Sequence, residues 1–276
     1  MTTEPGFVTI EVGTDGARGG LILNRPAKRN PLSSLALQEL AAAARWFDAQ
    51  PEVKVVVVSG RGRSFCAGAD LAAFASAAPP GALSARNAAD LGRLMADAIE
   101  AMTAVTVARI HGHCVGGGVV LASACDLRVA ADDTYFSIPE VDLGIPLAWG
   151  GIPRLVREIG PALTKELVMT CRPFSAEEAR AAGFLNRVVP AAALDDEVEA
   201  LVAQLVAKSS LTLQSTKRHV DAVTAQMVGP AGSWADADGL ANALHDPESR
   251  EVAARYVAGL QPSVPPTPSA RGRRRG

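Results

Sequence analysis

The stretch that most constrains this chain lies at residues 104–122. It begins as a β-branched apolar run, turns at Gly112 and at the three glycines of residues 116–118, and ends as a small-residue helix. A strand that feeds a glycine turn into a helix points unpaired backbone N–H groups at one spot. That spot suits a phosphate or an oxyanion that forms on a carbonyl. Taken alone, the pattern favours a simpler role for the glycines, which is close packing of strand and helix.

Length and composition restrict the class of protein. The chain has 276 residues, enough for one large α/β domain with an appendage or for two domains. Its formal net charge of −2 argues against a nucleic-acid partner, although residues 271–275 are locally basic. The N-terminal residues lack the pattern of a signal peptide, and no apolar run reaches the length of a membrane span. We therefore expect neither a nucleic-acid nor a membrane partner.

Four cysteines, Cys66, Cys114, Cys125 and Cys171, stand in apolar surroundings without the spacing of metal ligands. This usage is typical of reduced, buried packing residues in a cytoplasmic protein. The sequence accordingly predicts no metal site and a cytoplasmic location.

Hydrophobic patterning over the first half of the chain predicts alternating strands and helices. We expect a hairpin of residues 7–12 and 20–23, a basic loop at 24–31, a helix from Ser33 or Ser34, a buried parallel strand at 53–60, a loop at 61–70, a mobile connection at 72–84, a helix at 85–102, and strands at 126–130 and 134–137 on either side of an acidic turn. This order favours right-handed βαβ units rather than two unrelated domains.

The second half of the chain has a helical pattern. Pro161 suits the first position of a helix, Ser175 with Glu178 fits a capping box, and Gly183 suits a helix end. A helix at 193–207 and two or three more to about residue 260 carry apolar faces that suggest packing on another subunit. We divide the chain into a catalytic core (1–200), a C-terminal helical oligomerisation region (201–261) and a disordered Pro/Arg-rich tail (262–276).

Two glycine turns follow two buried strands in the same way. The first is at residues 65–70 and the second at 115–118. If the strands are parallel neighbours, both turns lie at the carboxyl edge of the sheet, where ligands bind. One N–H from each turn would then form a two-donor oxyanion hole. Phosphate binding is the competing idea, but the chain has neither a G-K-[ST] nor a G-x-G-x-x-G motif.

Glu140 is the acid–base candidate, because it follows Pro139 among apolar residues that would raise the pKa of its carboxyl. The simpler alternative is a surface glutamate in a turn. Asp142 is a weaker candidate, and Asp70 suits the N-cap of a helix from residue 71. His111 and His113 lack triad partners, and we interpret them as packing or supporting groups.

Several segments in order resemble the crotonase superfamily, the enoyl-CoA hydratases and isomerases. The resemblance covers residues 7 to about 260 and rests on segments 23–33, 65–71, 111–118, 136–145, 150–155 and 179–189. It implies a spiral of repeated ββα units with a C-terminal helical region that builds homotrimers, often dimers of trimers. It also implies an acyl-CoA substrate of fatty acid metabolism, with no cofactor beyond the coenzyme A thioester itself.

The resemblance assigns roles to individual residues. The thioester oxygen would be held by the N–H groups of Ala69 and Gly117, with Glu140 as the catalytic acid/base. The candidates for contacts with substrate or coenzyme A are Arg25, Lys28, Ala67, Gly68, Asp70, Gly116 and Trp149.

The chain departs from the family pattern at Val120, where hydratases carry a second glutamate. Moving a double bond needs one base, whereas adding water is better served by two, so isomerisation is mechanistically preferred. The alternatives are a single-glutamate enoyl-CoA hydratase, which forms a 3-hydroxyacyl-CoA from a 2-enoyl-CoA, and a non-catalytic acyl-CoA binding protein. Trp149 replaces part of the usual proline–glycine loop, where it either reshapes the acyl pocket or packs. Residues 258–262 lack the lysines with which some members reach coenzyme A from a neighbouring subunit.

Overall fold

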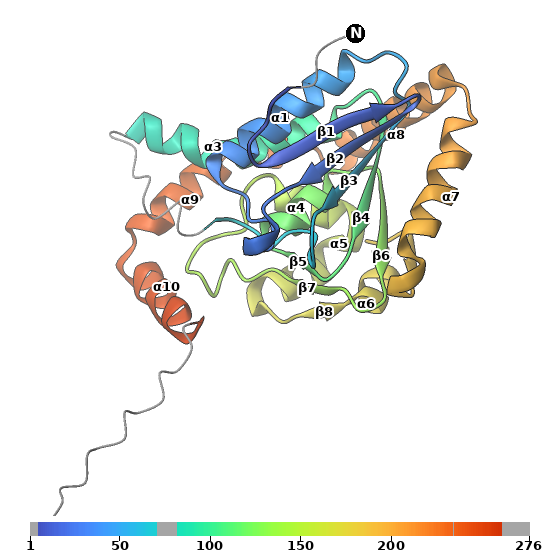
Figure 1. Ribbon diagram of the computed structural model, residues 1–276. Coiled ribbons are helices and arrows are strands. Elements are labelled where there is room, and N and C mark those ends of the chain that lie inside the picture. The colour runs from blue at the N-terminus through green and yellow to red at the C-terminus, as the bar shows by residue number, and fades with distance from the viewer. Residues whose placement is uncertain (1–4, 71–81, 234, 261–276) are drawn as a thin grey trace, which may run out of the picture.

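A six-stranded sheet forms the centre of the molecule in the computed structural model, which describes residues 5–70, 82–233 and 235–260 (Figure 1). Its strands, in spatial order, are β1 (Ile10–Asp15), β2 (Arg18–Leu23), β3 (Val55–Gly60), β4 (Val105–Ile110), β6 (Leu127–Ala131) and β9 (Arg187–Val189). The hairpin β1–β2 is antiparallel, and every later pair is parallel. Parallel strands need crossover connections, and α1 and α3 supply the first two.

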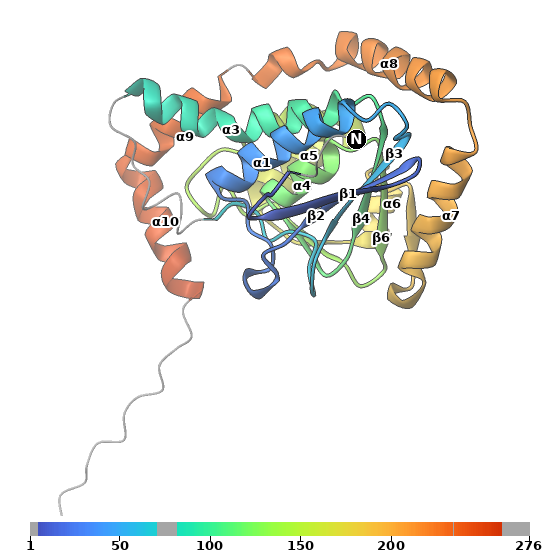
Figure 2. The ribbon, with the colours of Figure 1, turned by 45° about the horizontal axis from the view of Figure 1, so that its top comes forward.

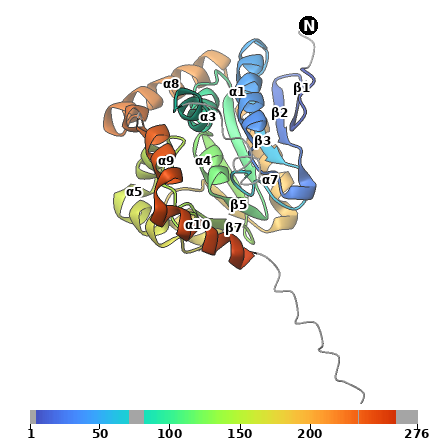
Figure 3. The same ribbon diagram turned by 90° about the vertical axis from the view of Figure 1, so that its left-hand side faces the viewer.

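Helices cover both faces of this sheet and then continue around it. They are α1 (Ser34–Asp48), α3 (Ala82–Glu100), α4 (Gly117–Ser123), α5 (Gly151–Thr170), α6 (Ala176–Ala181), α7 (Leu194–Val206), α8 (Ser210–Met227), α9 (Asp236–His245) and α10 (Pro247–Leu260), with short 3₁₀ turns η1 (Pro26–Lys28), η2 (Ala191–Ala193) and η3 (Pro230–Ser233). Figure 2 shows α7, α8, α9 and α10 following one another around the outside of the sheet. Figure 3 shows α1 and α3 side by side over α4.

The side chains of β3 point alternately to the two faces of the sheet, and this explains the two layers of the core. Val56 and Val58 point into the larger cluster with α1 and α3, whereas Val55 and Val57 point to the opposite face, where α7 packs. The α7 residues on that face are Leu194, Val198, Leu201 and Val202. Because both faces are covered, the strand is apolar at consecutive positions, as buried parallel strands are.

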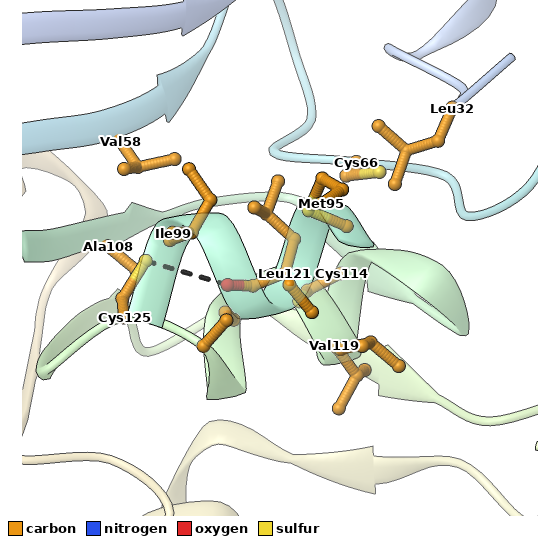
Figure 4. Close-up of a cluster of buried hydrophobic side chains, with 14 of the residues drawn as sticks. Leu32, Val58, Cys66, Met95, Ile99, Ala108, Cys114, Val119, Leu121 and Cys125 are labelled. Atoms are coloured by element: carbon orange, nitrogen blue, oxygen red, sulfur yellow. Dashed lines mark hydrogen bonds between the residues drawn. The ribbon is translucent and has the colours of Figure 1, made fainter. Parts of the chain in front are cut away.

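The larger cluster surrounds α4, which is buried along its whole length. Figure 4 shows Leu121 and Cys125 beside Ile99 and Ala108, with the Cys125 thiol donating to the Leu121 carbonyl at 3.5 Å. Cys66 and Cys114 lie in the same cluster. The start of α4, and with it the glycine turn, is thus fixed by packing on several sides.

Most expected elements are present, with shifted ends. The helix from Ser33 is confirmed, because the Ser33 hydroxyl accepts the Ala36 N–H as an N-cap. Ser175 caps α6 in the same way, and the chain turns at Gly183 with φ +92°. Helix α5 is interrupted at Gly160, and Pro161 begins its second segment as expected. The expected connection at 72–84 lies mostly outside the described residues.

A second, three-stranded sheet is absent from the sequence prediction. It consists of β5 (His113–Val115), β7 (Tyr135–Ser137) and β8 (Phe174–Ser175). Strands β6 and β7 flank the acidic turn as expected, but they belong to different sheets. Three-residue strands are too short to carry a periodic signal, which is why the hydrophobic pattern does not predict β5. β5 places the glycine turn directly beside the segment that ends in Glu140.

Candidate active site

The two glycine turns meet beyond the carboxyl ends of β3 and β4. β3 and β4 are parallel neighbours, and beyond them the Cys66 N–H donates to His113 O while Val115 N–H donates to Cys66 O, both at 3.0 Å. Gly68 has φ +89°, and a Cβ at this position would lie 2.9 Å from Val115 O and 3.6 Å from Gly117 N. Only glycine fits there, so the backbones of the two turns approach closely.

Two N–H groups at this meeting point have no acceptor among the described residues, those of Ala69 and Gly117. Three nearby N–H groups of these turns are engaged: Ala67 N–H donates to Arg29 O, Asp70 N–H to Leu32 O and Gly116 N–H to Ser137 O, each at 2.9 Å. Gly117 begins α4, so its N–H also lies at the positive end of that helix. Two adjacent unsatisfied donors suit an oxygen that gains negative charge.

Glu140 follows β7 and lies against the second turn. A Cβ on Gly116, where φ is +49°, would lie 2.3 Å from Glu140 Oε1. Burial raises the pKa of Glu140 to about 7, opposed by a hydrogen bond from its own backbone N–H. Its Oε2 is inaccessible to solvent and has no hydrogen-bond partner among the described residues. The expected rise in the pKa of Glu140 is present, and the alternative of a solvated surface glutamate is not supported.

The side chains around Glu140 are mostly apolar. Val120 is buried in α4 one turn after Gly117, and its Cγ2 would lie 2.9 Å from a Cβ on Gly151. Trp149 is 7% exposed, and its ring lies against Gly117. Asp142 donates its backbone N–H to the Cys171 thiol at 3.4 Å. Among the described residues, no second carboxyl contributes to the raised pKa of Glu140.

The basic loop reaches the first turn through an ion pair. Arg25 Nη1 lies 2.7 Å from Asp70 Oδ2, and the Asp70 side chain is 9% exposed. Lys28 is exposed at the end of η1. The expected N-cap role of Asp70 concerns a helix that lies outside the described residues, and the described contact of its carboxylate is with Arg25.

Asn30 holds this loop in place, and sequence reasoning missed it. Its side-chain amide donates to the carbonyls of Arg61, Ser64 and Phe65 at 2.8–3.2 Å, and its Oδ1 accepts the Arg25 N–H at 2.9 Å. The residue is buried and left-handed, with φ +56°. The available signal was the type of residue, since asparagine tolerates this conformation and bonds to nearby backbone.

The histidines and cysteines have structural environments. His111 Nε2 lies 2.8 Å from Gly62 O, and His113 Nδ1 lies 3.3 Å from Ser64 Oγ. Burial lowers the pKa of both imidazoles. The four cysteines are free and buried, as expected, and burial raises the pKa of Cys66 to about 12. Within the described ranges no group of three His, Cys, Asp or Glu residues is arranged to hold a metal.

A cleft of about 660 Å³ lies away from Glu140, between α8 and the amino ends of β4 and β6. Two ion pairs lie on its wall. Arg128 Nη2 lies 2.7 Å from Glu158 Oε2, and Lys217 Nζ lies 2.8 Å from Asp126 Oδ2. The charges of these four residues therefore already have partners.

The fold and the site define a mixed α/β protein in which, among the described residues, two glycine turns with free backbone donors meet and a buried carboxyl lies against the second turn. Residues 19–264 match the family profile described as enoyl-CoA hydratase/isomerase. The chain therefore belongs to this family, the crotonase superfamily, and is an enzyme of the hydratase/isomerase type.

Individual relatives agree with this assignment. The chain is 33% identical over 272 residues to the peroxisomal Delta(3,5)-Delta(2,4)-dienoyl-CoA isomerase of Arabidopsis thaliana, covering 92% of this chain and 98% of the relative. It is 35% identical over 228 residues to the crotonyl-CoA hydratase of Syntrophomonas wolfei, covering 82% and 86%. The crystal structure of an enoyl-CoA hydratase from Mycobacterium avium subsp. paratuberculosis superposes with a TM-score of 0.81 at 26% identity, covering 89% and 98%. The predicted fold class is thus confirmed.

The described helices include none that is both long enough and apolar enough to cross a membrane.

Proposed function

We propose that the enzyme moves a carbon–carbon double bond in an enoyl-CoA thioester, with Glu140 as the only carboxylate that transfers protons. Glu140 removes a proton from the carbon next to the thioester of a 3-enoyl-CoA. The same carboxyl then returns a proton to the γ-carbon, which gives the 2-enoyl-CoA. The observation that carries this proposal is the lone buried carboxyl of Glu140 beside the start of α4, with Val120 where a hydratase would have its second acid.

The dienolate formed between these two proton transfers carries negative charge on the thioester oxygen. The N–H groups of Ala69 and Gly117 are proposed to donate to that oxygen, and each such donor contributes about 3 kcal/mol of transition-state stabilisation in other enzymes. A pKa near 7 suits Glu140 to both steps, because the carboxyl exchanges its proton near neutral pH. This reaction requires no cofactor beyond the coenzyme A of the substrate.

We also propose which residues of the two turns and of the basic loop contact the substrate. Arg25 and Lys28 are cationic groups that suit the phosphates of coenzyme A. Ala67, Gly68 and Asp70 of the first turn, and Gly116 of the second, are proposed to line the thioester and pantetheine path. Gly68 supports this because its lack of a side chain lets the backbones of the two turns approach each other closely.

We further propose that the enzyme is a homotrimer or a dimer of trimers in the cytoplasm. Apolar side chains on α8 remain exposed in the single chain, among them Leu211 (77%) and Met227 (76%). Isolated chains rarely leave such a face uncovered. Light scattering after size-exclusion chromatography tests the assembly. The four free thiols are consistent with a reducing compartment.

The reaction is tested by incubation with a 3-enoyl-CoA and a 2-enoyl-CoA in parallel. We expect bond migration that is lost in Glu140→Gln. Water addition without migration would replace the proposal by the hydratase alternative, which the relative named crotonyl-CoA hydratase favours. Tight binding of the esters in calorimetry, with no turnover of either, would leave the binding-protein alternative.

A further inference from the structure

Trp149 has a backbone conformation that a tryptophan rarely adopts. Its φ is +63°, and the next residue, Gly150, has φ +70°. A bulky residue in the left-handed region is strained, and it persists only where the surroundings force it. The contacts that hold Trp149 in place therefore outweigh the energetic cost of its backbone conformation.

Three helices hold this turn in place. The Gly150 N–H donates to Asp236 Oδ2 of α9 at 2.8 Å, and Arg154 Nη1 of α5 donates to Gly150 O at 3.2 Å. Arg154 is 2% exposed and lies 2.9 Å from Asp97 of α3. Hydrogen bonds thus hold the turn at both the N–H and the carbonyl of Gly150.

Two glycines make room for the indole. A Cβ on Gly92 of α3 would lie 2.0 Å from Trp149 Cδ2, and a Cβ on Gly117 would lie 2.3 Å from Cζ3. Any side chain at either position would collide with the ring. The indole consequently lies between α3 and the first residue of α4, which carries a proposed oxyanion donor.

The indole and Glu140 contact adjacent residues of the same turn. Glu140 Oε1 occupies the side-chain space of Gly116, and Trp149 occupies that of Gly117. The Trp149 segment also covers Val120, since Gly151 comes against Val120 Cγ2. The indole therefore lies against the residue that directly follows the one contacted by the Glu140 carboxyl, and this residue carries a proposed oxyanion donor.

We propose that Trp149 is the specificity-determining residue of this site, and that its indole keeps water from the β-carbon so that Glu140 only moves protons. This inference rests on the proposed function. It adds that the choice between bond migration and hydration is made by Trp149 and by the absence of an acid at Val120 together. Asp236 and Arg154 are positioning residues that act through the Trp149–Gly150 turn.

The test compares Trp149→Leu with wild type on a 3-enoyl-CoA and a 2-enoyl-CoA in two labelled solvents. Conversion of the 3-enoyl-CoA into the 2-enoyl-CoA reports bond migration, and deuterium uptake from D₂O shows how often the Glu140 proton exchanges with solvent between the two steps. Incorporation of ¹⁸O from H₂¹⁸O reports hydration. Trp46→Leu is the matched control, because Trp46 lies on α1 and packs against Phe47 with ring centroids 4.9 Å apart. Circular dichroism confirms folding, and Trp149→Phe serves if the leucine variant does not fold.

We expect Trp149→Leu to raise the ratio of ¹⁸O incorporation to bond migration about tenfold, while Trp46→Leu leaves the ratio unchanged. A folded Trp149→Leu that binds the ester with the wild-type ratio overturns the inference, as does a wild type that moves the double bond and also hydrates readily with Trp149 in place. Wild-type enzyme that forms no 2-enoyl-CoA from the 3-enoyl-CoA contradicts the proposed function instead. Bond migration and ¹⁸O incorporation therefore separate the two failures.

Discussion

Glu140 occupies the side-chain space of Gly116. The Glu140 Oε1 atom lies 2.3 Å from the point where residue 116 would carry a Cβ, and Gly116 itself has φ +49°. Residue 116 must therefore be glycine for two separate reasons, the contact and the backbone. The contact also explains how the carboxyl of Glu140, which follows β7, is buried. The absence of a side chain at Gly116 leaves space for it.

Gly116→Ala is expected to lower kcat about 100-fold or more, because its methyl group displaces the Glu140 carboxyl from the proton-transfer position. Steady-state kinetics on a 3-enoyl-CoA measures the loss. Gly20→Ala is the control, since nothing lies within 4 Å of a Cβ at residue 20 and no positive φ occurs there. Equal activity of Gly116→Ala and wild type would show that the carboxyl is not needed at this position.

The pKa of Glu140 sets the pH dependence of the reaction. If the deprotonated carboxyl of the free enzyme is the base, kcat/KM rises with pH and levels off above a pKa of about 7. Rate profiles from pH 5 to 9 with a non-titrating substrate measure this. A profile that is already flat at pH 5 would mean that Glu140 titrates like an exposed glutamate or that it does not act as the base.

The same carboxyl affects stability. Its folded pKa of about 7 lies above the ordinary value of 4.5, so between these values the folded state holds a proton that the unfolded state has lost. Stability contributed by Glu140 is therefore complete below pH 4.5 and decreases as the pH rises to 7, by at most about 3 kcal/mol. Denaturant unfolding at pH 5 and 8 should show a smaller decrease in Glu140→Gln than in wild type. An equal decrease in both proteins would assign it to other groups.

The main lines of the fold were predictable because they follow from periodic patterns. Buried parallel strands are apolar at consecutive positions, as in β3, and helices such as α1 carry a cap together with an apolar face. The meeting of the two glycine turns followed from the parallel order of β3 and β4. The location of Glu140 beside Gly116 required the pairing of β7 with β5, and β5 is a strand of three residues that leaves no period in the sequence.

The role of Trp149 could not be settled from the sequence, since both its alternatives, packing and shaping the acyl pocket, depend on distant glycines. Gly92 lies 57 residues earlier and makes space for the ring only in the folded chain. Asp236, which fixes the turn through Gly150, lies on α9. Contacts between side chains far apart in the sequence leave no local pattern, which is why a strained tryptophan looked like an ordinary departure from the family motif.

Arg25 is expected to contribute to the binding of coenzyme A and not to the chemical step. Arg25→Ala should raise KM for an acyl-CoA about tenfold, the worth of one charge-assisted hydrogen bond. KM for the acyl-pantetheine thioester, which lacks the nucleotide, should stay unchanged. Arg187→Ala is a matched control, because it also breaks an ion pair, here at the β9 edge of the sheet. Arg187 Nη1 lies 2.6 Å from Glu197 Oε1. A rise in KM that is equal for both thioesters would rule out a contact with the nucleotide part.

Asn30→Ala is expected to destabilise the protein by about 3 kcal/mol, because it leaves three carbonyls that now accept from its amide without their donor. It also places alanine at φ +56°, where asparagine is better tolerated. Urea unfolding monitored by circular dichroism measures the change. Asn24→Ala removes a single hydrogen bond, to Glu11 at 2.6 Å, and should cost about 1 kcal/mol. If the two variants are equally stable, the amide of Asn30 does not organise the loop. If Asn30→Ala is the less stable and also has a raised KM, the basic loop depends on Asn30 to present Arg25 beside the first glycine turn.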